Sequence, residues 1–325
     1  MTIHHRRAIH ESAANALNRA PEASRIALVY GAVGCGLSLL ATVISALLSN
    51  KISGAGGLSN IGLRSVLSTG QNVLPLVNTL IVACLSLGYH IAILSFTRGY
   101  DASVRTLKSG FRFFGSVLRV MLTQWAVYFL LAIGALYISS FIFTVTPFAE
   151  PFMEAMEPYI SGSSLSGLVI DSSVVYAAAD TMMPMVWIYL AVALTLIVPV
   201  CYRFRMVNFC LADDPQNGAI FALSKSRLIM RRNCFALFRL DLTMWWFYAA
   251  QLFISLVCYG DILLPLLGVS FPWSDAVSYY LFFGLSLALQ LALYRFGLNR
   301  VTAAYAVVYD ILQANMPQPK KDVQM

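Results

Sequence analysis

Three ionisable side chains lie within or at the edge of long hydrophobic stretches, namely His90, Arg239 and Asp241. A charge in such surroundings is costly, so each residue is a candidate for function and needs a partner. His90 has no histidine, cysteine or carboxylate three or four residues away, which argues against a metal site; a hydrogen bond across a helix interface is the simpler expectation. Arg239 and Asp241 are two residues apart and do not share a helical face, so we expect separate partners or anchoring at a membrane surface. The alternative is that this pair faces a substrate.

No other residues have the spacing of a catalytic or binding motif. The sequence lacks a phosphate-binding loop, His-Glu-x-x-His and Gly-x-Ser-x-Gly. The six cysteines include no Cys-x-x-Cys, so we predict no catalytic residue, no metal and no cofactor. Gly31, Gly34 and Gly36 are not a dinucleotide fingerprint, because they lie inside a hydrophobic stretch without a preceding strand. We expect these glycines, and Gly284, to let helices approach closely.

The composition indicates that the chain lies in a membrane. Of 325 residues, 59% are hydrophobic and 11% are charged, with a mean hydropathy of +0.72; soluble domains carry about 25% charged residues. A helix that crosses a bilayer needs roughly 20 apolar residues, and six stretches meet this requirement. The sequence therefore predicts an all-α, polytopic transmembrane helix bundle. Its spans are expected at residues 26–48, 73–97, 120–146, 184–202, 233–258 and 277–299.

The distribution of positive charge predicts the orientation. Of the 22 Lys and Arg residues, all except Lys51 and Arg64 fall on one side of the predicted spans. The side rich in Lys and Arg is normally the cytoplasm. We therefore expect a multi-pass protein of the cell membrane with both termini cytoplasmic. It would comprise a cytoplasmic segment (residues 1–25), a six-span domain (26–312) and a polar tail (313–325). The sequence assigns no role to the acidic outer segment, residues 148–183.

The two long cytoplasmic connections are expected to form amphipathic helices at the membrane interface. In residues 102–119 an apolar stripe repeats every three or four positions, and basic residues follow one position later. A second basic helix is expected at about 216–232, with Asp213 and Asp214 capping its start before Pro215. Such helices place their cations among anionic headgroups. The expected anionic-lipid contacts are Arg105, Lys108, Arg112, Arg119, Lys225, Arg227, Arg231 and Arg232.

Four runs carry a resemblance to a known family: Leu87-Gly88-Tyr89 with Arg98; Ala212 to Pro215; Ala222 to Arg227 with Met230, Phe238 to Leu242 and Trp245; and Ala303-Ala304-Tyr305 with Tyr309. Together they resemble a bacterial integral-membrane family catalogued as domain of unknown function, family 975. The resemblance implies a membrane protein and no activity. The family is distantly similar to membrane domains found beside glycerophosphodiester phosphodiesterases. The chain departs from the family after Met230, where Arg231-Arg232-Asn233 stand in place of the usual glycine.

These observations leave three classes of function. We expect a non-enzymatic membrane component that is transport-associated or interacts with lipid. Its expected contacts are the anionic headgroups of the bilayer and possible membrane-protein partners. We expect no binding of nucleic acid. The alternative is a transporter with a cavity near His90 and Asp241. An intramembrane enzyme has the least support, because no nucleophile, base or metal set is visible.

Overall fold

The computed structural model describes residues 6–54, 61–154, 172–266 and 275–316. These residues are helical nearly throughout and none of them forms a strand, which confirms the all-α prediction. Within them, six helical segments are long and apolar enough to cross a membrane, as predicted. Their bounds are Glu22–Ser49, Ser68–Thr97, Phe114–Val145, Met183–Asp213, Cys234–Cys258 and Val277–Ala314.

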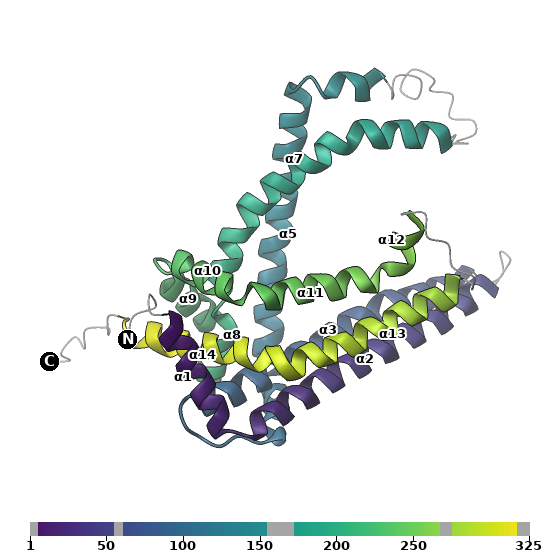
Figure 1. Ribbon diagram of the computed structural model, residues 1–325. Helices are drawn as coiled ribbons and strands as arrows, with labels where there is room; N and C mark the ends of the chain where they lie inside the picture. The colour runs from purple at the N-terminus through teal and green to yellow at the C-terminus, as the bar shows by residue number, and fades with distance from the viewer. Residues whose placement is uncertain (1–5, 55–60, 155–171, 267–274, 317–325) are drawn as a thin grey trace. The chain divides into compact units, whose positions relative to one another are not determined.

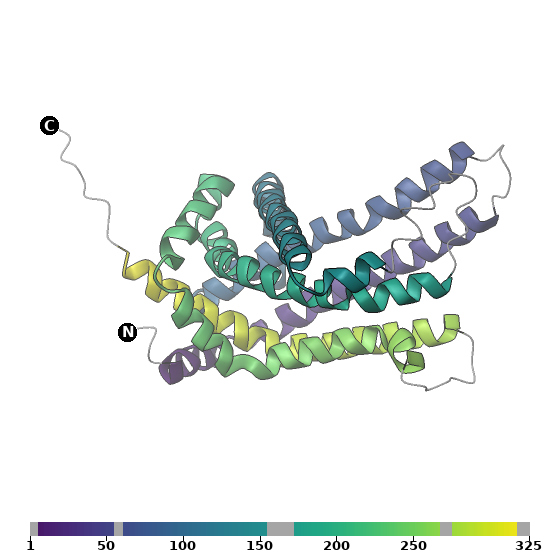
Figure 2. The same cartoon turned by 90° about the horizontal axis from the view of Figure 1, so that it is seen from above.

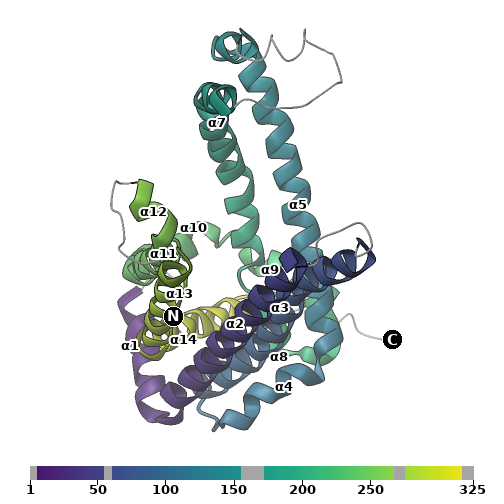
Figure 3. The ribbon, with the colours of Figure 1, turned by 90° about the vertical axis from the view of Figure 1, so that its right-hand side faces the viewer.

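The chain divides into two compact units. Residues 1–120 and 205–325 form the first unit, and residues 121–204 form the second. The second unit consists mainly of two long helices, α5 (Phe114–Val145) from residue 121 onward and α7 (Ser172–Phe204); both can be followed in Figure 3. One stripe of α5 is buried, formed by Ala135, Ser139 and Phe143, whereas Tyr137 on the same helix is 73% exposed. Large exposed apolar side chains on long helices are what a lipid-facing surface requires.

The first unit contains four long helical segments that run alongside one another. Helix α2 (Glu22–Gly54) packs along α3 (Ile61–Thr97), α13 (Asp275–Leu293) lies against α2, and α11 (Trp245–Cys258) lies against α13 (Figures 1 and 2). The sixth span is continuous but changes geometry, since a π-helical turn (Tyr294–Leu298) joins α13 to α14 (Asn299–Ala314). The fifth span is interrupted by a 3₁₀ turn. Its parts are α10 (Cys234–Asp241), η4 (Leu242–Met244) and α11.

Shorter helices gather at the end of this unit where the first span begins and the second and sixth spans end. Helix α1 (Arg6–Arg19) packs on α14 and α3. Helix α8 (Val207–Asp213) packs on α3, and α9 (Gly218–Met230) packs on α8. The largest buried side chains include Tyr89, Met206 and Tyr309, so the core of the unit lies at this end.

The predicted amphipathic helix at residues 102–119 is not one helix. The structure has a 3₁₀ turn, η2 (Val104–Lys108), a four-residue helix, α4 (Ser109–Arg112), and a break at Phe113 before α5 begins. Leu107 and Gly110 are buried, because this segment packs on α3, whereas Phe111 and Phe114 of the predicted apolar stripe are exposed. Tertiary packing has therefore overridden the helical periodicity. A helix is present at the second predicted position, as α9, and its place at a membrane interface stays a prediction.

Close backbone approach occurs at glycines other than those that the spacing indicated. A methyl group on Gly110 would lie 1.9 Å from the carbonyl oxygen of Cys84, and one on Gly88 would lie 2.3 Å from that of Leu107. By contrast, Gly34, Gly36 and Gly284 have no atom of another element within contact distance of such a methyl group, so the prediction for them was wrong. Gly31 does lie against a neighbour, the ring of Tyr294.

Candidate functional site

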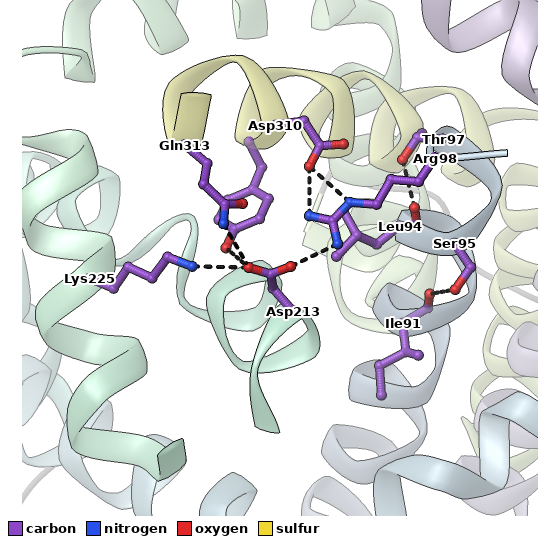
Figure 4. A network of polar contacts seen from close by, with 10 residues as sticks. Ile91, Leu94, Ser95, Thr97, Arg98, Asp213, Lys225, Asp310 and Gln313 are labelled. Carbon is purple, nitrogen blue, oxygen red and sulfur yellow. Dashed lines mark hydrogen bonds and ion pairs between the residues drawn. The ribbon is translucent and has the colours of Figure 1, made fainter. Parts of the chain in front are cut away.

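A carboxylate at the end of α8 joins four helices of the first unit. Asp213 accepts hydrogen bonds or ion pairs from Arg98 at the end of α3, Lys225 on α9, and Tyr309 and Gln313 on α14, at 2.7 to 3.1 Å. Figure 4 shows Arg98, Lys225 and Gln313 pointing toward the Asp213 carboxylate from different helices. We call these five residues, with Asp310, the Asp213 cluster. Asp213 does not cap the helix that follows, as its sequence position had suggested; nor does Asp214 make a side-chain cap bond.

Arg98 is the bridge within the Asp213 cluster. Its Nη1 lies 2.7 Å from Asp213, and its Nη2 and Nε donate to Asp310 at 2.7 and 3.1 Å. Burial disfavours the charged guanidinium, but hydrogen bonds to the two carboxylates outweigh it and raise the pKa of Arg98 above its ordinary value. The side chain of Asp213 is 13% exposed, so its own pairs are partly shielded from water, whereas the Arg98 and Asp310 side chains are 32% and 33% exposed. Every charge in the cluster has a partner, which indicates that the cluster holds the helices together.

A second network accounts for Asp241. The Tyr305 hydroxyl donates to the Asp241 carboxylate, and Arg205 donates to the oxygens of both Tyr305 and Tyr248, at 2.9 and 2.7 Å. Because Tyr305 has only one hydroxyl proton, Tyr248 must donate to Tyr305 in the bond between the two hydroxyls. Asp241 thus satisfies its charge within the protein rather than presenting it to a substrate.

Arg239 and His90 lie apart from that network. The guanidinium of Arg239 stacks on Phe235 of its own helix, 4.5 Å from the ring centroid, and the residue is exposed. Arg239 and Asp241 therefore have separate partners, in keeping with the two-residue spacing. The Nδ1 of His90 lies 2.6 Å from the backbone carbonyl oxygen of Ser86, and its ring packs edge-on against Phe209. Among the described residues, no group of three His, Cys, Asp or Glu side chains could hold a metal ion.

The basic residues predicted to contact lipid fall into two sets. Lys225 belongs to the Asp213 cluster, with its ammonium 3.0 Å from the carboxylate and its side chain 12% exposed, so it points into the protein. The other seven are exposed on the surface: Arg105, Lys108, Arg112, Arg119, Arg227, Arg231 and Arg232. Their exposure is compatible with contact to headgroups, and their lipid contacts stay a prediction.

The sequence did not single out a cavity that the structure places between α1, η4 and the start of α14. It has a volume of about 640 Å³. We call it the basic cavity, because three guanidinium groups and a histidine line it. Its polar and aromatic lining comprises Arg6, Arg7, His10, Asn18, Thr243, Trp246 and Arg300. Neither this cavity nor a second one described below is lined by His90 or Asp241.

The charges of the basic cavity are not neutralised within the described part of the chain. No ion pair there joins Arg6, Arg7 or Arg300 to a carboxylate, in contrast to Arg98 and Lys225. Arg6 and Arg7 also occupy the first turn of α1, the end at which the helix dipole disfavours positive charge. Three like charges around one cavity repel one another, and an anion would relieve both costs.

Two contacts fix the walls of this cavity. The Nε2 of His10 lies 2.8 Å from the hydroxyl of Thr243, which itself donates to the carbonyl oxygen of Leu240 at 2.6 Å. The single hydroxyl proton is thereby used, so His10 must be the donor, and the bond ties α1 to η4. On the opposite wall, the ring of Trp246 packs against Gly297 in the π-helical turn, where a methyl group would lie 3.1 Å from the indole.

We predict that acid loosens α1 through His10. Burial lowers the pKa of His10 from its ordinary value of 6.5, so the packed state favours the neutral ring. The stability that neutral His10 gives to the packing of α1 is fully present above about pH 6.5. It is lost as the pH falls toward the lowered pKa, because His10 binds a proton more readily when α1 is released than when it is packed. Cleavage by trypsin after Arg19 should accelerate as the pH falls from about 7.5 to 5.5, relative to a variant without the titrating ring. A His10→Gln variant keeps a donor that does not titrate and corrects for the enzyme's own pH dependence; an equal acceleration in both proteins would contradict the prediction.

Sequence reasoning missed the basic cavity for a definable reason. Arg300 lies almost 300 positions after Arg6 and Arg7 in the sequence, and only the packing of α1 on α14 brings the three together. Arg300 follows the last predicted span, where the sequence alone favours a solvated helix charge. The one available signal was the pair of arginines at the start of a helix without an acidic residue in its first turn.

Comparison with known proteins supports the family resemblance. Residues 12–295 match the model of a family described as a protein of unknown function, DUF975. No curated protein and no solved structure matches the chain. The residues that carried the resemblance include Arg98, Asp213, Lys225, Tyr305 and Tyr309, all of which belong to the two polar networks.

Proposed function

We infer the function from the basic cavity and the charge distribution, because the chain belongs to the DUF975 family, which is described as a protein of unknown function. We propose that it is a multi-pass protein of the cell membrane, with both termini in the cytoplasm, that binds an anionic phospholipid in the basic cavity. Its role is non-enzymatic and depends on lipid contact and on association with other membrane proteins.

One observation carries this proposal, the meeting of three uncompensated guanidinium groups around a cavity of about 640 Å³. Guanidinium groups form paired hydrogen bonds with phosphate oxygens, which suits a phospholipid headgroup. Trp246 adds an amphipathic ring of the kind enriched at membrane interfaces, and it is partly exposed beside the apolar surface of α11. The positive charge of residues 1–25 and of the chain around the sixth span's end supports a cytoplasmic location for this cavity.

The transporter alternative has less support at the place where the sequence located it. Asp241 accepts a hydrogen bond from Tyr305, and His90 is within hydrogen-bond distance of Ser86. Asp241 Oδ1 and His90 Nδ1 would have to give up these bonds to bind a substrate through the same atoms.

Thermal stability in nanodiscs tests the lipid proposal. Phosphatidylglycerol discs should raise the midpoint of unfolding relative to phosphatidylcholine discs, since a ligand that binds the folded state stabilises it. Replacing Arg6, Arg7 and Arg300 together with glutamine should remove most of that difference. A matched triple variant, Arg19→Gln with Arg25→Gln and Arg239→Gln, removes three exposed cations that neither line the cavity nor belong to the predicted lipid contacts, and it should keep the difference.

Two further outcomes are decisive. Soluble glycerophosphate, added to phosphatidylcholine discs, should give a smaller shift than phosphatidylglycerol, because the lipid is held at the surface at high local concentration. An equal or larger shift would assign the cavity to a free phosphate compound instead. If the two triple variants responded alike, the difference between lipids would be a general surface effect and the proposal would be wrong.

A further inference from the structure

A second cavity lies within the spans themselves, at the end of the first unit away from the Asp213 cluster. It has a volume of about 470 Å³ and lies between the later half of α2, the early half of α3 and the start of α13. Its lining carries no Lys, Arg, His, Asp or Glu. The polar groups that the argument uses are Ser38, Thr42, Ser45, Gln71, Asn78 and Tyr279.

The hydroxyl groups form a stripe on one face of α2. Ser38, Thr42 and Ser45 recur at helical spacing in a span that is otherwise strongly apolar. The Thr42 hydroxyl donates to the carbonyl oxygen of Ser38 at 3.0 Å, so its proton is used and its lone pairs stay free to accept. Such back-bonding alone would make these residues ordinary helix-packing contacts. What separates this face from ordinary packing is the cavity in front of it and the amide on its opposite wall.

That amide leaves a buried acceptor without a donor. The Oδ1 atom of Asn78 is buried and has no hydrogen-bond partner, and no other buried side-chain nitrogen or oxygen in the described residues is in that state. An unpaired buried polar atom costs about 1–3 kcal/mol. A second acceptor lies two turns earlier on the same face, because Pro75 has no N–H to give to the backbone carbonyl of Gln71.

We propose that this cavity binds a small uncharged molecule that carries several hydroxyl donors, of the polyol class. Two acceptors, Asn78 Oδ1 and the Gln71 carbonyl, lack a donor, while the side chains of Ser45, Gln71 and Tyr279 can donate or accept, so a ligand whose hydroxyl groups do both suits the lining. A charged ligand would enter without a counter-charge, which is unfavourable inside a span. The volume falls within the range of small-molecule pockets and far exceeds one water molecule. The site is independent of the basic cavity and of the lipid proposal.

The test uses glycerol, erythritol and xylitol on the purified full-length protein, with glycerate as a charged comparison. At least one polyol should raise the unfolding midpoint of the wild type by about 2 °C or more, and glycerate should not. Asn78→Leu should abolish that shift. It should also leave the stability of the ligand-free protein equal or higher, because it removes an unsatisfied acceptor; an asparagine with a purely structural role would lower it.

Thr79→Val is the matched control. Thr79 is the next residue on α3, is exposed, and donates only to the carbonyl of Pro75 within its own helix. This variant should keep the polyol shift. Equal shifts in the wild type and in Asn78→Leu would show a general solvent effect, and no shift with any of the three polyols would mean a cavity that holds only water; either result overturns the proposal.

Discussion

Replacing Gly110 with alanine should destabilise the first unit by about 3 kcal/mol or more, since overpacking at a rigid contact has few ways to relax. The added methyl group would lie 1.9 Å from the carbonyl oxygen of Cys84 and 2.9 Å from the backbone nitrogen of Gly88. Both neighbours are backbone atoms of α3, so neither can rotate away as a side chain could. The helices would have to separate along the contact that positions η2 and α4 on α3.

Size-exclusion chromatography after heating in detergent provides the measurement. Gly110→Ala should lose its monodisperse peak at a much lower temperature than the wild type. Gly115→Ala is the control, because a methyl group there meets no atom within contact distance and alanine is the better helix former. Should the two variants lose the peak at the same temperature, the close approach of α3 and α4 would be wrong.

Replacing Asp213 with alanine should have the second large effect, about 3–4 kcal/mol, because it leaves opposite charges buried without their partner. Arg98, Lys225, Tyr309 and Gln313 would each lose an acceptor at once. Arg98 would retain Asp310, whereas Lys225, with a side chain 12% exposed, would have little access to water. The loss should therefore separate α9 from α8 and α14.

The neighbouring carboxylate gives the matched control. Among the described residues, Asp214 accepts a side-chain hydrogen bond only from Asn217, in the adjoining turn. Asp214→Ala should therefore change the unfolding midpoint little. In an Asp213→Ala background, Lys225→Met should restore part of the lost stability, because it removes the unpaired charge. Equal effects of the two aspartate variants, without rescue by Lys225→Met, would show that Asp213 does not join these helices.

Much of the fold follows from the sequence because the bilayer imposes it. Apolar stretches of sufficient length predict the six spans, and the structure confirms them. Local packing at the ends was not predictable in the same way. Residues 102–119 have the period of an amphipathic helix, yet Leu107 and Gly110 are drawn onto α3, and the helix breaks at Phe113. Periodicity reports which residues could share a face, but not which partner that face will meet.

The candidate site was less accessible to sequence reasoning. His90, Arg239 and Asp241 stood out because charge is rare in a span, and the structure shows partners that explain Asp241 without a substrate. Arg6, Arg7 and Arg300 did not stand out, since each is an ordinary charge in its own segment. The same holds for Asn78, whose missing hydrogen bond is visible only once α2, α3 and α13 are packed.

Binding of an anionic phospholipid in the basic cavity is the central claim, and native mass spectrometry of the protein released from mild detergent tests it most directly. We predict that the wild type retains phosphatidylglycerol from mixed phosphatidylglycerol and phosphatidylcholine membranes, and that the variant with glutamine at positions 6, 7 and 300 loses it. The control variant with glutamine at positions 19, 25 and 239 should retain the lipid, because its substitutions lie outside the cavity. Equal retention of phosphatidylglycerol by the wild type and the cavity variant would contradict the proposed function.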